Sequence, residues 1–246
     1  MCGRYALTHS PESVENALGA VVEAFPPRFN IAPTQPILVV TSGPRRDPGS
    51  NQPDRAAMLV RWGFIPDWAR DAGQFPLLIN ARSETAATKA SFRAAMRHRR
   101  VLIPASGFYE WKRAGRKIAQ PYWVRPRDGG VVAFGGLMET HSEPGGAEID
   151  TAAILTCPAN TQIAHIHDRM PVVVRPEHFQ RWLDCVNNEP RDVADIMYPV
   201  DPGFFDVIPV SEKVNKVANT GPDIQETAEV PEPAGKTPPK DQLDLF

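Results

Sequence analysis

The chain has 246 residues and a net charge of −2, and it contains no apolar run long enough to span a bilayer. These properties exclude a transmembrane helix and a protein that is basic over its whole surface. Its three cysteines, Cys2, Cys157 and Cys185, lack the spacing of metal ligands and leave one thiol unpaired, so we expect a cytoplasmic protein without metal or other cofactor.

The elements that the sequence predicts are mostly strands. Ser10-Pro11-Glu12 indicates a helix start, with Val14, Leu18 and Val21 at helical spacing. Residues 28–33 read as a loop, and residues 42–55 as a polar, turn-rich insertion. Further strands are expected at 36–41, 58–62, 100–111, 121–126, 131–138, 151–157, 171–175 and 205–210, and further helices at 91–99, from 176, and near 191–197. Strands that do not alternate with helices argue against a parallel sheet. We therefore predict one α+β domain, with a mostly antiparallel curled sheet or β-barrel and a few flanking helices.

The first five residues, Met1-Cys2-Gly3-Arg4-Tyr5, carry unusual chemistry if Met1 is removed. Cys2 would then hold an α-amine and a thiol on adjacent carbons, and such a pair condenses with aldehydes to a thiazolidine. The ordinary pKa values, about 8 for the amine and about 8.5 for the thiol, leave part of each group nucleophilic near neutral pH. A cysteine near a terminus is, on its own, more often a small buried apolar residue.

Three further stretches carry polar and charged residues of types that are rare in a buried core. Asn80, Arg82 and Glu84 follow an apolar run, Glu110 lies between Tyr109 and Trp111, and His167 lies two residues before Arg169. Each has a plain structural alternative. Glu110 could pair with Arg82, His167 could be a satisfied loop histidine, and Asn80 could cap a helix.

Taken in order, the segments MCGRY, FNIAPTQ, RWGFIPDWA, INARSET, IPASGFYEW and IHDRMPVVV resemble the SRAP (SOS response-associated peptidase-like) family. The resemblance runs from Cys2 to about Ile224, so we expect one SRAP domain over residues 1–224 and a separate tail over residues 225–246. It implies a curved, largely antiparallel barrel with flanking helices, in agreement with the pattern of elements.

The resemblance also implies a covalent sensor of abasic sites in single-stranded DNA, with a lyase-like Schiff-base reaction. By motif position, Cys2 is the crosslinking residue, and Asn80, Glu110 and His167 complete the site. His165 does not occupy the motif position. Contacts with DNA are implied for Arg4, Asn30, Pro33, Arg82, Trp111, Thr156 and Arg169, of which Thr156 has the weakest local match. We expect a monomer in the cytoplasm, associated with the nucleoid.

Two other function classes stay open at this stage. The first is a thiol peptidase, because Cys2, His167 and Glu110 supply a thiol, an imidazole and a carboxylate. The second is a binding module that holds single strands without a covalent bond. Acetylation of the amine would abolish crosslinking but spare a peptidase, and a denaturing gel would dissociate a noncovalent complex.

The end of the chain changes composition sharply. Residues 226–241 are rich in proline and acidic residues, so this stretch is predicted to be disordered. It is followed by Gln242-Leu243-Asp244-Leu245-Phe246. The alternative is a terminal strand that packs back on the domain. QLDLF, however, resembles the pentapeptide that docks bacterial polymerases on the sliding clamp, with Gln242 forming hydrogen bonds and Leu243, Leu245 and Phe246 filling an apolar pocket.

Overall fold

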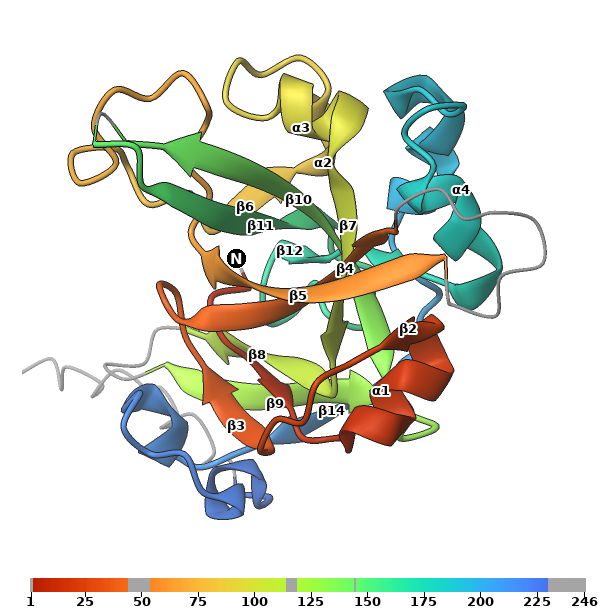
Figure 1. Cartoon of the computed structure of the whole chain (residues 1–246). Coiled ribbons are helices and arrows are strands. Elements are labelled where there is room, and N and C mark those ends of the chain that lie inside the picture. The colour runs from red at the N-terminus through yellow and green to blue at the C-terminus, as the bar shows by residue number, and fades with distance from the viewer. Residues whose placement is uncertain (1, 44–53, 114–118, 144, 230–246) are drawn as a thin grey trace, which may run out of the picture.

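Two β-sheets dominate the fold (Figure 1). The computed structural model describes residues 2–43, 54–113, 119–143 and 145–229. In the first sheet the strand order is β14-β9-β8-β1-β3, and all neighbouring strands are antiparallel. Its strands are β1 (Tyr5–Leu7), β3 (Arg28–Ile31), β8 (Gly107–Lys112), β9 (Gln120–Pro126) and β14 (Phe205–Pro209).

The second sheet closes on itself. Its main order is β12-β11-β10-β7-β4-β5-β2, with β13 beside β10 and β6 beside β11. A parallel pairing between β5 and β11 joins strands that lie far apart in that order, so β4, β5, β11, β10 and β7 form a ring. The strands are β2 (Ala20–Val21), β4 (Pro36–Ser42), β5 (Arg55–Trp62), β6 (Asn80–Arg82), β7 (Arg100–Ala105), β10 (Val132–Ser142), β11 (Glu148–Pro158), β12 (Arg169–Pro171) and β13 (Val173–Val174). The predicted mostly antiparallel barrel is thereby confirmed.

Short helices flank the sheets. The α-helices are α1 (Pro11–Leu18), α2 (Ser83–Ala86), α3 (Arg93–His98) and α4 (Phe179–Leu183), and the 3₁₀ helices are η1 (Pro176–His178), η2 (Pro190–Met197), η3 (Glu212–Asn215) and η4 (Pro222–Gln225). The Ser10 hydroxyl accepts the amide N–H of Ser13 and so caps α1. Within the described ranges, no helix has the length and apolar content needed to cross a membrane.

The structure corrects several of the predicted elements. Residues Arg28–Ile31 form β3 and not a loop, because Ile31 pairs with Tyr5 of β1. Val21 lies beyond α1 and is 67% exposed in β2. The segment near 191–197 is the 3₁₀ helix η2. Most of the insertion predicted over residues 42–55 lies outside the described residues.

The strand predicted over 100–111 is in fact two strands in different sheets. β7 ends at Ala105, and β8 begins at Gly107 after a single intervening residue. Gly107 has a φ of +152°, and a Cβ there would lie 2.3 Å from the Val124 carbonyl oxygen. Only glycine fits at this position, where the chain crosses from one sheet to the other. The crossing carries the chain from the barrel into the strand that holds Glu110.

Aromatic rings join the two sheets. The Tyr5 ring of the first sheet meets Trp62 and Phe134 of the second edge to face, at centroid distances of 5.3 and 6.4 Å. Phe108 of β8 packs on Phe134 at 6.0 Å. Cys2, three residues before Tyr5, is fully buried in the same apolar core.

Candidate active site

Cys2 is fully buried just ahead of β1. The Asn80 side-chain amide donates to the Cys2 carbonyl oxygen over 3.0 Å, and the Cys2 Sγ lies 3.9 Å from the Arg4 carbonyl oxygen. Asn80 is the first residue of β6, which pairs with the central part of β11. Among the residues that the structure describes, no group donates to the buried Asn80 Oδ1. Asn80 therefore tethers Cys2 and still offers one acceptor.

The environment disfavours ionisation of the Cys2 thiol. Burial raises the pKa of this thiol well above its ordinary value, and the nearby Glu110 carboxylate acts in the same direction. The thiolate is the strong nucleophile of a cysteine. A thiol that stays protonated is better suited to trapping an intermediate late in a reaction than to making the first nucleophilic attack.

Glu110 is the buried carboxyl group of the site. It lies on β8 with 2% of its surface exposed. Burial raises the pKa of Glu110, whereas the nearby His167 lowers it. A carboxyl group with a raised pKa can take up and release a proton close to neutral pH.

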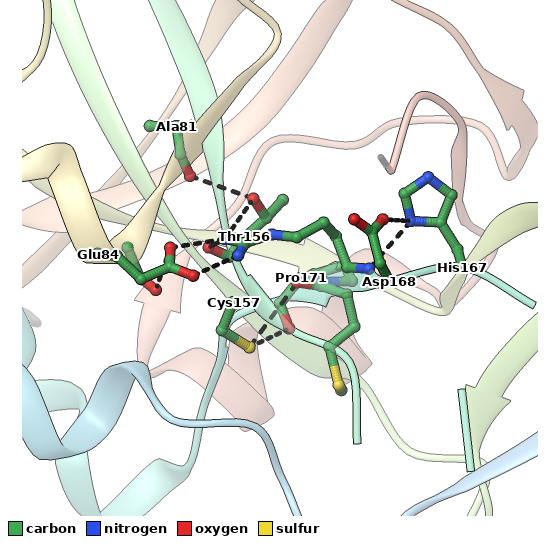
Figure 2. Close-up of polar contacts among 10 residues, drawn as sticks. Ala81, Glu84, Thr156, Cys157, His167, Asp168 and Pro171 are labelled. Atoms are coloured by element: carbon green, nitrogen blue, oxygen red, sulfur yellow. Dashed lines mark hydrogen bonds and ion pairs between the residues drawn. The ribbon is translucent and has the colours of Figure 1, made fainter. Parts of the chain in front are cut away.

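His167 comes from the segment that leads into β12. Its Nδ1 accepts the Arg169 amide N–H at 3.0 Å and lies 2.9 Å from the Asp168 Oδ1 (Figure 2). His167 lies near enough to Glu110 to lower its pKa, and Glu110 lies near enough to Cys2 to raise the pKa of the thiol, so the three residues belong to one site. Four separate segments therefore converge here, and they supply Cys2, Asn80, Glu110 and His167.

Three of the residues predicted to contact DNA form one cluster. The Arg4 Nη1 donates to the Asn30 Oδ1 at 2.7 Å and to the Val214 carbonyl at 2.8 Å, and its guanidinium lies 5.8 Å from the centroid of the Trp111 ring. The Trp111 indole N–H in turn donates to the Asn215 Oδ1 at 2.7 Å. Segment 212–219, which sequence reasoning did not single out, therefore shapes this face.

The other predicted contacts differ in their exposure. Arg82 is exposed, Pro33 is half-buried and Thr156 is fully buried. The Thr156 hydroxyl donates within the sheet to the Ala81 carbonyl oxygen at 3.4 Å. A role of these residues in DNA binding stays a prediction, and the exposed Arg82 is the member most accessible to a phosphate.

Arg169 is held from within the protein. Its guanidinium donates to both carboxylate oxygens of Glu84, with Nη2 2.8 Å from Oε2, and to the Thr156 carbonyl oxygen (Figure 2). The hydrogen bond from Arg169 lowers the pKa of Glu84 to about 2. The ion pair considered from the sequence, between Glu110 and Arg82, is a different one. An ion pair between residues 85 positions apart carries no local sequence signal.

The comparisons with a family model, with curated relatives and with solved structures agree with one another. Residues 1–217 match the family described as SOS response associated peptidase (SRAP). The abasic site processing protein YoqW of Bacillus subtilis is 34% identical, with 92% of this chain and all of YoqW covered. The abasic site processing protein YedK of Escherichia coli is 31% identical over 91% of this chain and 98% of its own length. A crystal structure of a Bacteroides thetaiotaomicron protein shares the fold, with a TM-score of 0.78, 21% identity, and coverage of 93% of this chain and all of that one.

Proposed function

The chain belongs to the SRAP family, and we propose that it processes abasic sites in single-stranded DNA by forming a covalent crosslink through Cys2. The relatives named abasic site processing proteins support the substrate. The observation that carries the chemistry is a buried Cys2 tethered by Asn80, with Glu110 and His167 in electrostatic contact.

The proposed reaction begins with removal of Met1, which frees the α-amine of Cys2. An abasic deoxyribose is mainly a closed hemiacetal and reacts through its open aldehyde. The amine adds to the aldehyde carbon, and the resulting carbinolamine loses water to give an imine. The thiol then adds to the imine carbon, and its proton ends on nitrogen. One water is lost in total, and the phosphate backbone stays intact.

Each side chain of the site can serve one step of this reaction. His167 gives a proton to the ring oxygen of the sugar as it opens. Glu110 accepts a proton from the attacking amine and returns it when water leaves. Asn80 holds the main chain of Cys2 and orients the amine. In this order the amine attacks first, and the thiol, whose pKa burial raises, traps the imine afterwards.

The proposed DNA face comprises Arg4, Asn30, Pro33, Arg82, Trp111, Thr156 and Arg169. Arginines bind phosphates, and an aromatic ring such as that of Trp111 stacks on an unpaired base. A rigid Pro33 within this face would block a partner strand, which favours single strands and junctions.

A thiol peptidase is the second candidate, and the family description favours it. A peptidase would need a thiolate from the start, whereas burial raises the pKa of the Cys2 thiol. Acetylation of the Cys2 amine separates the two candidates. It should abolish crosslinking of an abasic oligonucleotide, but it should leave cleavage of a peptide unaffected.

A denaturing gel with an abasic oligonucleotide tests the proposal. We expect a band of protein joined to DNA that survives detergent with the trimmed wild-type protein and disappears with Cys2→Ser. An adduct of equal yield from Cys2→Ser would contradict a thiazolidine. A complex that forms on native gels and dissociates in detergent would establish the noncovalent binding module instead.

The sequence supports a second partner. Gln242, Leu243, Leu245 and Phe246 lie outside the described residues, and the proposal that they bind a bacterial sliding clamp rests on the QLDLF pattern alone. A synthetic peptide of the last ten or so residues should bind purified clamp with roughly micromolar affinity. Replacing Leu245 and Phe246 by Ala should abolish binding and leave the rate of crosslinking in solution unchanged. Absence of clamp binding by the intact protein would contradict this proposal.

A further inference from the structure

Trp62, the last residue of β5, contacts the segments that carry Asn80 and Cys2. Its side chain is fully buried. Its indole N–H donates to the carbonyl oxygen of Ile79, the residue before Asn80, at 2.9 Å. Its ring meets the ring of Tyr5, three residues after Cys2, edge to face at a centroid distance of 5.3 Å. One side chain therefore connects the two segments that the hydrogen bond between Asn80 and Cys2 also joins.

The Ile79 carbonyl oxygen accepts two hydrogen bonds. The second comes from the Ile154 amide N–H of β11 at 3.0 Å, so the indole and the neighbouring strand occupy both lone pairs of this oxygen. The carbonyl belongs to the planar peptide unit that joins Ile79 to Asn80. Because this plane is held from two sides, it sets the position from which the Asn80 side chain reaches the Cys2 carbonyl oxygen at 3.0 Å.

The main chain of Trp62 is itself firmly held. Its amide N–H donates to the Gln35 carbonyl oxygen at 2.9 Å, and its carbonyl oxygen accepts the Thr34 amide N–H at 2.7 Å. The same residue pairs with Ala152 of β11, in the parallel pairing that closes the ring of strands. These main-chain bonds do not depend on the indole, so a side-chain substitution can test the loss of the indole N–H.

We propose that Trp62 is a positioning residue for crosslinking, whose indole N–H fixes the peptide before Asn80 so that Asn80 aligns the main chain and α-amine of Cys2 for attack. This inference rests on the proposed function for the reaction that the alignment accelerates. The alignment itself is a property of the protein without DNA. The two parts can therefore fail separately.

Crosslinking kinetics provide the first measurement. Trp62→Phe keeps an aromatic ring beside Tyr5 and removes the N–H. It should lower the rate constant at a saturating concentration of abasic oligonucleotide about tenfold, because a small misplacement of reacting groups is costly. Its affinity for undamaged single strands should stay within about twofold of wild type, since the substitution removes no proposed DNA contact.

The matched control is Trp182→Phe. Trp182 is also fully buried, and its indole N–H donates to the Val101 carbonyl oxygen, likewise at 2.9 Å. This variant loses an equivalent bond outside the site and should keep the wild-type rate. A wild-type rate in Trp62→Phe, or an equal loss in Trp182→Phe, would overturn the proposal.

A double-mutant cycle shows whether Trp62 acts through Asn80. Asn80→Ala removes the side chain that Trp62 is proposed to position. In that background Trp62→Phe should therefore change the remaining rate by less than about twofold. A further loss as large as that in the wild-type background would show that Trp62 acts by another route, and would overturn the proposal.

Hydrogen exchange of the Asn80 side-chain amide in DNA-free protein, followed by nitrogen-15 NMR, provides a third measurement, with Asn80→Asp to assign the signal. Exchange should be severalfold faster in Trp62→Phe or, if that variant does not fold, in Trp62→Met, and unchanged in Trp182→Phe. Unchanged exchange in the folded Trp62 variant would overturn the positioning role. A wild-type protein with a protected Asn80 amide but no crosslink would instead refute the proposed function.

Discussion

At the scale of single residues, Cys2 carries two nucleophiles, its α-amine and its thiol. The buried thiol has a raised pKa, so the amine is the first to react in the proposed order. The order of attack therefore predicts which reaction step remains when the thiol is removed.

Cys2→Ala should lose the stable adduct and keep a reactive amine. Because this amine can still form an imine, borohydride should trap a covalent product from Cys2→Ala and an abasic oligonucleotide. Without borohydride the same variant should give none. If borohydride traps no product from a variant shown to lack Met1, the thiol attacks first and the proposed order is wrong.

Glu110→Gln should separate the chemistry from DNA binding. The variant should slow crosslinking about 10²-fold or more, the typical contribution of general acid–base catalysis, and bind undamaged strands normally. An equal loss of DNA binding would reassign Glu110 to a structural role.

The same substitution should change the pH dependence of unfolding. Burial raises the pKa of Glu110, so the folded state binds its proton more tightly than the unfolded state does. This contribution to stability is complete below the ordinary carboxyl pKa and is lost as pH rises from there through the folded-state pKa. Each unit of upward shift amounts to ~1.4 kcal/mol. Urea unfolding at acidic and neutral pH should show this loss in wild type and a smaller one in Glu110→Gln. Identical pH profiles for both proteins would contradict a raised pKa.

At the scale of elements, sequence patterns predicted what is local and missed what depends on pairing. The capped start of α1 and most strands follow from residue types within a few positions. The strand β3 was mistaken for a loop because its partner β1 lies more than twenty residues earlier. The division of 100–111 into β7 and β8 depends on Gly107, whose need for glycine is set by Val124 of a neighbouring strand.

In the candidate site, too, some residues could be predicted from the sequence and others could not. The resemblance named Cys2, Asn80, Glu110 and His167, and the structure brings them together. The Glu84–Arg169 pair and the contacts of segment 212–219 could not be predicted, because tertiary packing alone brings these partners together.

Segment 212–219 depends on one buried amide. The Asn30 Nδ2 donates to the carbonyl oxygens of Lys216 at 3.1 Å and Asn219 at 2.8 Å, and its Oδ1 accepts from Arg4. Asn30→Ala leaves these groups unsatisfied and should cost about 1–3 kcal/mol of stability. Hydrogen exchange should show loosening confined to segment 212–219 and its neighbours. Unchanged protection there would contradict a role of Asn30 as its anchor.

At the scale of the whole molecule, the net charge of −2 means that DNA affinity must come from local arginines. Affinity for single-stranded oligonucleotides should therefore still fall steeply with salt concentration. Arg82→Ala should reduce the slope of log affinity against log salt by about 0.7, the contribution of one single-strand phosphate. Arg191, 80% exposed on η2, is the matched control, and Arg191→Ala should leave the slope unchanged. An unchanged slope in Arg82→Ala would place this arginine away from the DNA.

The most direct test of the central claim is the intact mass of the purified protein before and after incubation with an abasic oligonucleotide. We expect the starting protein to lack Met1 and the product to weigh the sum of protein and oligonucleotide less one water. The same incubation with an undamaged oligonucleotide should leave the mass unchanged. A crosslink-competent protein that retains Met1, or a protein whose mass does not change with abasic DNA, would contradict thiazolidine formation at Cys2.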